Sequence, residues 1–126
     1  MGHDRISSKE GLALEDSVRK IAMLLPEVTE QVDAFGHTSF RVNDKPFVML
    51  GEGGPEGPSL SIKTLKLTQE ALLQQERFYK TPYIGQHGWT SILAKHITDW
   101  REIEDYLLEG YLRTAPKRLA KLVSPI

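Results

Sequence analysis

A stretch rich in glycine and proline interrupts the middle of the chain and limits what the segments on its two sides can form. Residues 51–59 (GEGGPEGPS) contain four glycines and two prolines, a composition that predicts a loop. After the loop, Leu60 and Ile62 alternate with polar residues, which is the pattern of a half-buried strand. Lys45 and a run of apolar residues at 46–50 precede the loop. We therefore predict two strands joined by this loop as a hairpin connection or wing.

A second tight connection lies upstream of that hairpin. Phe40 and Val42 alternate with polar neighbours, and Asn43 with Asp44 supplies the turn residues that join two strands. A further strand is predicted at 89–93, where apolar residues resume. Together these segments predict an α+β fold, in which an antiparallel sheet of about four or five strands is covered by helices from both termini.

Helical spacing of apolar residues marks both ends of the chain. The first such pattern runs from Leu14 to Leu25 and is stopped by Pro26, since proline cannot continue a helix. Residues 1–9 show no periodicity and are predicted to be flexible. The whole chain has 126 residues, a length that fits one domain, which we place at 10–126.

The C-terminal half predicts three more helices. A short helix is predicted to start with Thr68 as its N-cap. The longest follows Asp99 and Glu102, which resemble a capping box. Pro116 then opens a last short helix. The residues predicted to face the core on the two C-terminal helices are Trp100, Ile103, Leu107, Tyr111, Leu119, Leu122 and Val123.

The segment 78–93 (FYKTPYIGQHGWTSIL) has the most unusual composition of the chain. It gathers four aromatic residues, a proline and two glycines without a helical period. Pro82 and the glycines favour turns, while the rings favour order over solvation. The segment is either a loop that feeds a core strand or a binding surface. On the second interpretation the ligand-binding residues, for a small molecule or a protein, are Tyr79, Thr81, Tyr83, His87 and Trp89.

Composition excludes several classes of function. The chain has no cysteine, so it has no disulfide, thiolate nucleophile or cysteine-ligated metal. No window is apolar enough to span a membrane, and the charged N-terminus does not resemble a signal peptide. We therefore expect no membrane association and a cytoplasmic location.

The positive charges form two groups. The formal net charge is −1, yet residues 64–126 hold nine Lys and Arg against seven Asp and Glu. Cations on exposed strand positions and on the C-terminal helices could contact phosphate. The same cations could instead protect strand edges or offset a helix dipole. The predicted nucleic-acid contacts are Arg41, Lys45, Lys63, Arg113, Lys117, Arg118 and Lys121.

Catalysis, metal binding and a cofactor have no matching motif. The four histidines lack the spacing of metal ligands, and no serine, histidine and acid combination is evident. The cluster of Glu27, Glu30 and Asp33 lacks the spacing of a calcium loop and is expected to be a solvated face. We therefore predict no catalytic residue, no metal ligand and no cofactor.

Four short motifs resemble those of the MmcQ/YjbR-like family. They are LPEVTE, SFRVNDKPF, FYKTPYIG and APKRL, at residues 25–30, 39–47, 78–85 and 115–119, and the resemblance covers about residues 14–123. It implies an α/β fold likened to the bacterial frataxins, with hairpins described as a double wing, and a DNA-binding function. Tyr83 stands where related sequences favour a histidine. The role that the family assigns to that histidine is therefore not carried over to this chain.

These observations leave two main hypotheses for function. The family resemblance and the basic groups favour weak binding of double-stranded DNA through the phosphate backbone. The segment 78–93 favours a module that binds a small ligand or a protein. An enzyme is the third and least supported interpretation.

Overall fold

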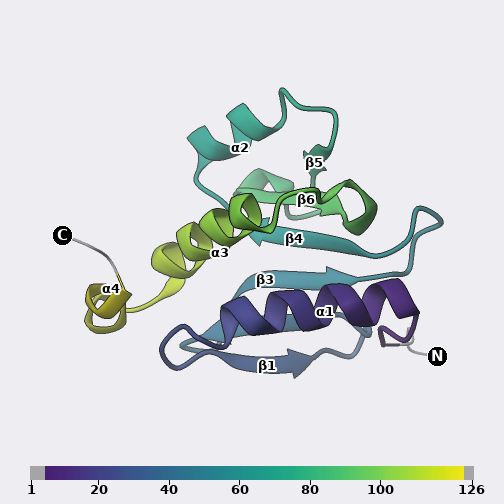
Figure 1. The fold of residues 1–126 in the computed structure, drawn as a ribbon. Helices are drawn as coiled ribbons and strands as arrows, with labels where there is room; N and C mark the ends of the chain where they lie inside the picture. The colour runs from purple at the N-terminus through teal and green to yellow at the C-terminus, as the bar shows by residue number, and fades with distance from the viewer. Residues whose placement is uncertain (1–4, 124–126) are drawn as a thin grey trace.

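Six antiparallel strands form a single sheet in the computed structural model, which describes residues 5–123. The strand order is β1-β2-β3-β4-β6-β5 (Figure 1). The first four strands are consecutive neighbours, and β6 pairs with β4 after an excursion through α2 and β5. The bounds are β1 Thr29–Val32, β2 Thr38–Val42, β3 Lys45–Gly51, β4 Ser59–Lys63, β5 Phe78–Lys80 and β6 Trp89–Leu93.

The predicted turns join these strands as expected. Asn43 and Asp44 both have positive φ, 53° and 59°, the conformation of a type I′ hairpin turn. β3 ends at Gly51 and pairs with β4 from Ser59. The loop rich in glycine and proline is therefore a hairpin connection, as its composition predicts.

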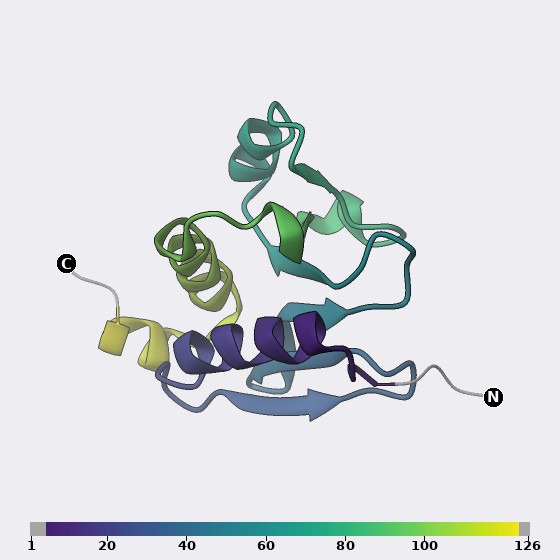
Figure 2. The same cartoon turned by 45° about the vertical axis from the view of Figure 1, so that its right-hand side comes forward.

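Helices α1 (Lys9–Ala22) and α3 (Trp100–Thr114) lie on the same side of the sheet (Figures 1 and 2). The short helices α2 (Lys66–Leu72) and α4 (Lys117–Val123) flank them, and two 3₁₀ turns, Gly85–His87 and Ala94–His96, adjoin β6. No helix within residues 5–123 is long and apolar enough to cross a membrane. The other face of the sheet is not covered by either long helix.

The core fills the space between the sheet and the two long helices. Val18 of α1, Phe40 of β2 and Leu107 of α3 are fully buried there. The rings of Phe47 and Tyr111 meet edge to face with centroids 5.7 Å apart, a favourable aromatic geometry. The Tyr111 hydroxyl donates to the carbonyl oxygen of Pro26, 2.9 Å away, and so ties α3 to the connection between α1 and β1.

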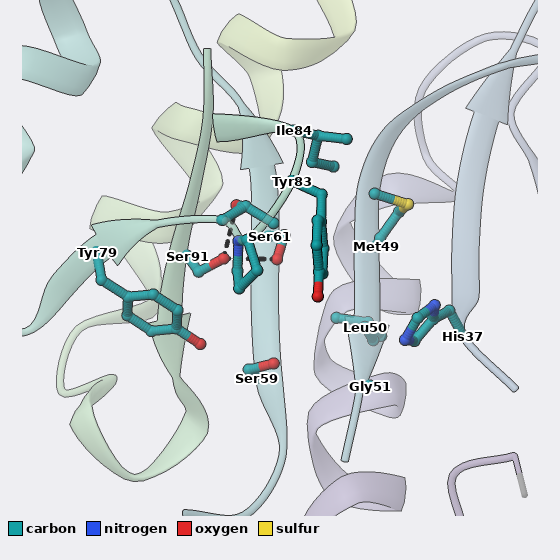
Figure 3. A pocket seen from close by; sticks show the side chains of 12 residues that line it. His37, Met49, Leu50, Gly51, Ser59, Ser61, Tyr79, Tyr83, Ile84 and Ser91 are labelled. Carbon is teal, nitrogen blue, oxygen red and sulfur yellow. Dashed lines mark hydrogen bonds between the residues drawn. The ribbon is translucent and has the colours of Figure 1, made fainter. Parts of the chain in front are cut away.

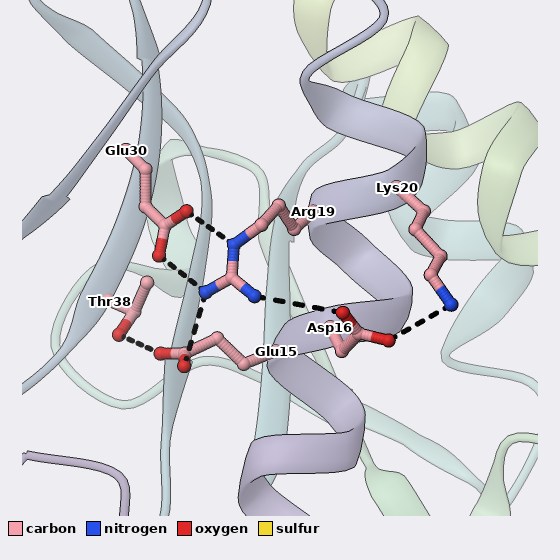
Figure 4. A network of polar contacts seen from close by, with 6 residues as sticks. All are labelled: Glu15, Asp16, Arg19, Lys20, Glu30 and Thr38. Carbon is pink, nitrogen blue, oxygen red and sulfur yellow. Dashed lines mark hydrogen bonds and ion pairs between the residues drawn. The ribbon is translucent and has the colours of Figure 1, made fainter.

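A polar network fastens α1 to the first two strands (Figure 4). Arg19 donates two hydrogen bonds of 2.7 Å to Glu30 of β1 and lies 3.3 Å from Glu15. Glu15 is only 4% exposed and accepts a 2.6 Å hydrogen bond from Thr38 of β2. Hydrogen bonding from Arg19 lowers the pKa of Glu30. Glu30 is thus part of a structural clamp, not of a freely solvated acidic face.

The strand count of six exceeds the four or five predicted. Two short edge strands, β1 and β5, account for the difference. Most residues of β1 are exposed, so β1 lacks the alternation of apolar and polar residues by which a strand is recognised. β5 has only three residues, too few to show a pattern.

Packing begins before the predicted domain start at residue 10. Ile6 is 3% exposed, and Ser8 caps α1 by accepting a hydrogen bond from the backbone of Gly11. Glu52, from the glycine-rich loop, accepts hydrogen bonds from Ser7 and Ser8. The contacts with Glu52 join distant parts of the chain and had no signal in the local sequence. Residues 1–4, the first part of the segment predicted to be flexible, lie outside the described range.

Two details of the predicted helices are wrong. Leu65, not Thr68, precedes α2, and the Thr68 hydroxyl, inside the first turn, donates to Glu109 of α3 at 2.8 Å instead of capping the helix. Leu122 is 69% exposed, since α4 packs mainly through Leu119. Trp100, at the start of α3, packs against the core as predicted but is only partly buried. The Asp99 cap is confirmed, because its side chain accepts from the backbone of Arg101.

Candidate pocket on the open sheet face and basic end of the sheet

The open face of the sheet carries a row of small and polar side chains. Strand pairing sets five residues side by side across five strands, and strand alternation places them all opposite the helix-covered face. From β2 to β5 the row is Ser39, Met49, Ser61, Ser91 and Tyr79. Their immediate neighbours along the strands, such as Phe40 and Ile92, face the core.

Three hydroxyls in and beside this row form a hydrogen-bonded chain (Figure 3). The Ser91 oxygen lies 2.7 Å from that of Ser61 and 2.7 Å from that of Thr81. Ser91 is 1% exposed and Ser61 is 9% exposed, so the chain forms a fixed polar floor. A hydroxyl both donates and accepts, and this floor can therefore meet either kind of group on a ligand.

A pocket of about 350 Å³ lies above this floor. Figure 3 shows the Tyr79 and Tyr83 rings on either side of Ser59 and Ser61, with the long helices behind the strands. The 81–84 segment forms much of one wall. The lining residues are His37, Met49, Leu50, Gly51, Ser59, Ser61, Tyr79, Thr81, Pro82, Tyr83, Ile84 and Ser91.

Tyr83 occupies an unusual position in this wall. Its backbone φ is +69°, a left-handed conformation that bulky residues rarely adopt. Its side chain is 95% exposed. Within residues 5–123 it makes neither a hydrogen bond nor a ring contact. The fold thus presents an aromatic ring to solvent at the pocket without any packing that stabilises the ring there.

The loop that carries Tyr83 is tied down at its base. The buried Gln69 of α2 donates hydrogen bonds to the carbonyl oxygens of Gly85 (2.9 Å) and Trp89 (3.0 Å). The Thr64 hydroxyl and amide both donate to the carbonyl of Gly88. Gly88 itself has a φ of +94°, and a Cβ there would lie 2.5 Å from the carbonyl oxygen of Thr64. Only glycine fits this turn, which holds the loop against the end of β4.

The structure brings together three of the five predicted ligand-binding residues. Tyr79, Thr81 and Tyr83 line the pocket. His87 is exposed in a 3₁₀ turn away from it, and Trp89 is 6% exposed. Trp89 is therefore a buried anchor of β6 and cannot serve as an accessible ligand contact.

The serines and His37 of the pocket are not among the residues predicted from the sequence. Ser61 and Ser91 did carry a signal, because each occupies an outward position among apolar strand residues. The sequence does not contain the register that aligns β4 with β6 and so places the two serines side by side.

The predicted basic residues gather around one end of the sheet, the end where β2 and β4 finish and β3 begins. Val42 pairs with Lys45, and Lys63 is the last residue of β4. Arg113 of α3 donates to the carbonyl oxygen of Thr64. At the same end, α4 follows α3 (Figure 1) and Arg118 pairs with Glu27, close to the start of β1. We call Arg41, Lys45, Lys63, Arg113, Lys117, Arg118 and Lys121 the basic end.

Two arginines of the basic end form ion pairs with carboxylates of this chain. Arg118 forms a two-point ion pair with Glu27, at 2.8 and 3.0 Å, which lowers the pKa of Glu27. Arg41 lies 3.9 Å from Asp44 and donates a 3.0 Å hydrogen bond to Ser39. Among the described residues, no ion pair involves the remaining members. The cations of the basic end that form no ion pair are therefore Lys45, Lys63, Arg113, Lys117 and Lys121, of which Arg113 is held by its hydrogen bond to Thr64.

Acidic and histidine side chains of the described residues do not assemble into a metal site. Within residues 5–123 no three of them lie close enough to share an ion.

The fold and these surfaces define an α+β sheet domain with one helix-covered face and one open polar face. A family model described as YjbR matches residues 23–113. The chain belongs to the YjbR family, which confirms the resemblance seen in its four sequence motifs. No curated protein matches the chain.

Proposed function

We propose that this chain binds double-stranded DNA weakly, through contacts between the phosphate backbone and the basic end. The observation that carries the proposal is the convergence of cations from two distant parts of the sequence. Lys45 and Lys63 come from the hairpins, while Lys117 and Lys121 come from α4. Membership of the YjbR family adds support, because the resemblance implies DNA binding.

The charges at the basic end favour weak binding without base recognition. Lysine contacts phosphate as a point charge, and base-specific contacts need side chains that reach into a groove. The bidentate arginine, Arg118, is already paired with Glu27. Neighbouring carboxylates and the net charge of −1 further limit affinity for a polyanion.

The test is a fluorescence-anisotropy titration of a short duplex at several salt concentrations. With about three or four phosphates neutralised, log K should fall against log salt with a slope near −3. Lys45→Ala, Lys63→Ala and Lys117→Ala should each reduce that slope by about one. Lys9→Ala is the matched control, since Lys9 is an exposed lysine at the start of α1, away from α4 (Figure 1).

Two results would contradict the proposal. The first is the absence of saturable binding at about 20 mM salt, where the release of counterions favours binding most. The second is an equal effect of Lys9→Ala and Lys117→Ala, which would mean that binding is not located at the basic end.

A further inference from the structure

We propose that the pocket on the open sheet face binds an uncharged planar heterocycle with hydrogen-bonding edges, the chemistry of a nucleobase. The ring would lie against Tyr83, and its edge would meet the hydroxyls of Ser61 and Thr81, which the buried Ser91 links. No residue of the basic end lines the pocket. This site therefore does not depend on the backbone binding proposed above.

The size and charge of the pocket limit the ligand. At about 350 Å³, its volume is near the lower end of the range for small-molecule sites, which suits one ring system better than a large cofactor. No lining residue is a carboxylate, lysine or arginine, and the one lining histidine, His37, has its Nδ1 3.5 Å from Asp33. A charged group placed on the hydroxyl floor would lose its hydration without an oppositely charged partner among the hydroxyls. A neutral ligand is therefore favoured.

Tyr83 supplies a face for stacking. Its ring is 95% exposed on a backbone with a φ of +69°, and backbone strain of this kind concentrates at functional sites. The 37% exposed ring of Tyr79 stands on the other side of the serines in Figure 3. Exposed aromatic side chains on a sheet are a common platform for unpaired bases.

The hydroxyl chain supplies hydrogen bonds to the ligand's edge. Three hydroxyls share two internal hydrogen bonds, so one hydroxyl proton and several lone pairs remain available. Reversing the direction of the chain moves the free proton between Ser61 and Thr81. The floor can therefore donate to a ring nitrogen or carbonyl and accept from an exocyclic amine, as a nucleobase edge requires.

The experiment is an NMR titration of the whole chain with adenosine, followed through backbone amides and methionine methyls. We expect shifts at Met49, Ser61 and Ser91 that are insensitive to salt, because adenosine carries no phosphate. Tyr83→Ala should weaken binding by about 5- to 150-fold, the measured range for loss of one stacked base. Tyr83→Phe keeps the ring and should bind like the wild type.

Three controls make the result specific. Leu122→Ala removes an exposed apolar side chain on α4 and should not alter binding. Lys117→Ala should weaken duplex binding without changing adenosine binding, which separates the two proposals. Ser61→Ala should weaken adenosine binding and leave the spectrum of the distant core unchanged.

A second pair of titrations identifies the source of the base. A short single strand of deoxyadenosine is compared with an abasic strand of the same length. Binding of adenosine itself supports a free nucleoside; binding of the deoxyadenosine strand alone, lost in Tyr83→Ala, supports an unpaired strand. The proposal is overturned if neither probe shifts the pocket residues, or if the abasic strand binds as well as the deoxyadenosine strand and Tyr83→Ala changes nothing.

Discussion

Gln69 donates a 2.9 Å side-chain hydrogen bond to the carbonyl oxygen of Gly85, so that α2 directly holds the loop that carries Tyr83. The same amide group reaches Trp89 at the start of β6. Gln69 is 2% exposed, and a buried amide of this kind is retained where it satisfies backbone groups that water cannot reach. The geometry of the pocket therefore depends on a residue that does not line it.

Replacing Gln69 by Ala should destabilise the domain by about 2 to 4 kcal/mol. The change leaves two buried carbonyl oxygens without a donor and opens a cavity. Urea denaturation measures the loss, and Gln74→Ala, at an exposed position of the same region, is the control, with an expected change below about 0.5 kcal/mol. If the two variants are equally stable, the loop is held by other contacts.

The contacts of Glu52 predict a dependence of stability on pH. Hydrogen bonds from the Ser8 hydroxyl and from the Ser7 and Ser8 backbone lower the pKa of Glu52 below its ordinary value of 4.5. A group with a lowered folded-state pKa stabilises the fold above the unfolded pKa, and that contribution is lost as pH falls through the folded value. Glu30 and Glu27 act in the same direction.

Glu52→Gln should therefore be less stable than the wild type at neutral pH, and the difference should shrink as the pH falls below 4.5. Chemical denaturation at a series of pH values measures it. The exposed Glu70 gives a control, because Glu70→Gln removes a carboxylate that accepts no hydrogen bond through its side chain among the described residues. A constant gap between wild type and Glu52→Gln across the acid range would contradict this account.

The packing of α3 and α4 can be tested by comparing one leucine from each helix. Leu107 is fully buried and Leu122 is 69% exposed. Leu107→Ala should cost about 2 to 5 kcal/mol of unfolding free energy, whereas Leu122→Ala should cost below about 0.5 kcal/mol. Equal losses in urea denaturation would mean that α4 packs differently from its position here.

The parts of the fold that could be predicted from sequence are those with local signals. The strand at 89–93, the Asp99 cap and the hairpin around 51–59 each depend on residues adjacent in the chain. Edge strand β1 was missed because its exposed residues carry no alternation. The cap on α1 and its partner Glu52 are far apart in sequence, and no local pattern reports such a pair.

The candidate site was predictable to a similar extent. Tyr79, Thr81 and Tyr83 belong to one unusual segment and could be selected together. The serine floor required the register of β4 against β6, and a shift of one residue would have turned those serines to the other face. The ion pair of Arg118 with Glu27 could not be predicted from the sequence either, although it determines which cations of the basic end remain available to a partner.

The loop that carries the aromatic residues should exchange its amides more slowly than the glycine-rich loop. Gln69 and Thr64 tie the first loop to α2 and β4. Within residues 53–57, by contrast, the only backbone hydrogen bond in the described structure is from Gly57 to Gly54. Hydrogen exchange followed by NMR should therefore show greater protection across 79–89 than across 53–57. Equally fast exchange in both would mean that the pocket wall is not held in place.

Tyr83 should be a residue whose replacement raises stability. Its left-handed backbone costs about 1 to 2 kcal/mol for most side chains, and its ring is 95% exposed, so little packing is lost when the ring is removed. Asparagine tolerates positive φ better than tyrosine does. We therefore expect Tyr83→Asn to increase the free energy of unfolding by up to about 1 kcal/mol, with Tyr83→Phe unchanged as the control. Stability gained at the expense of binding is the usual outcome where a strained residue serves a site. Urea denaturation of the two variants measures the effect, and a loss of more than about 0.5 kcal/mol in Tyr83→Asn would show that the ring stabilises the fold rather than a ligand.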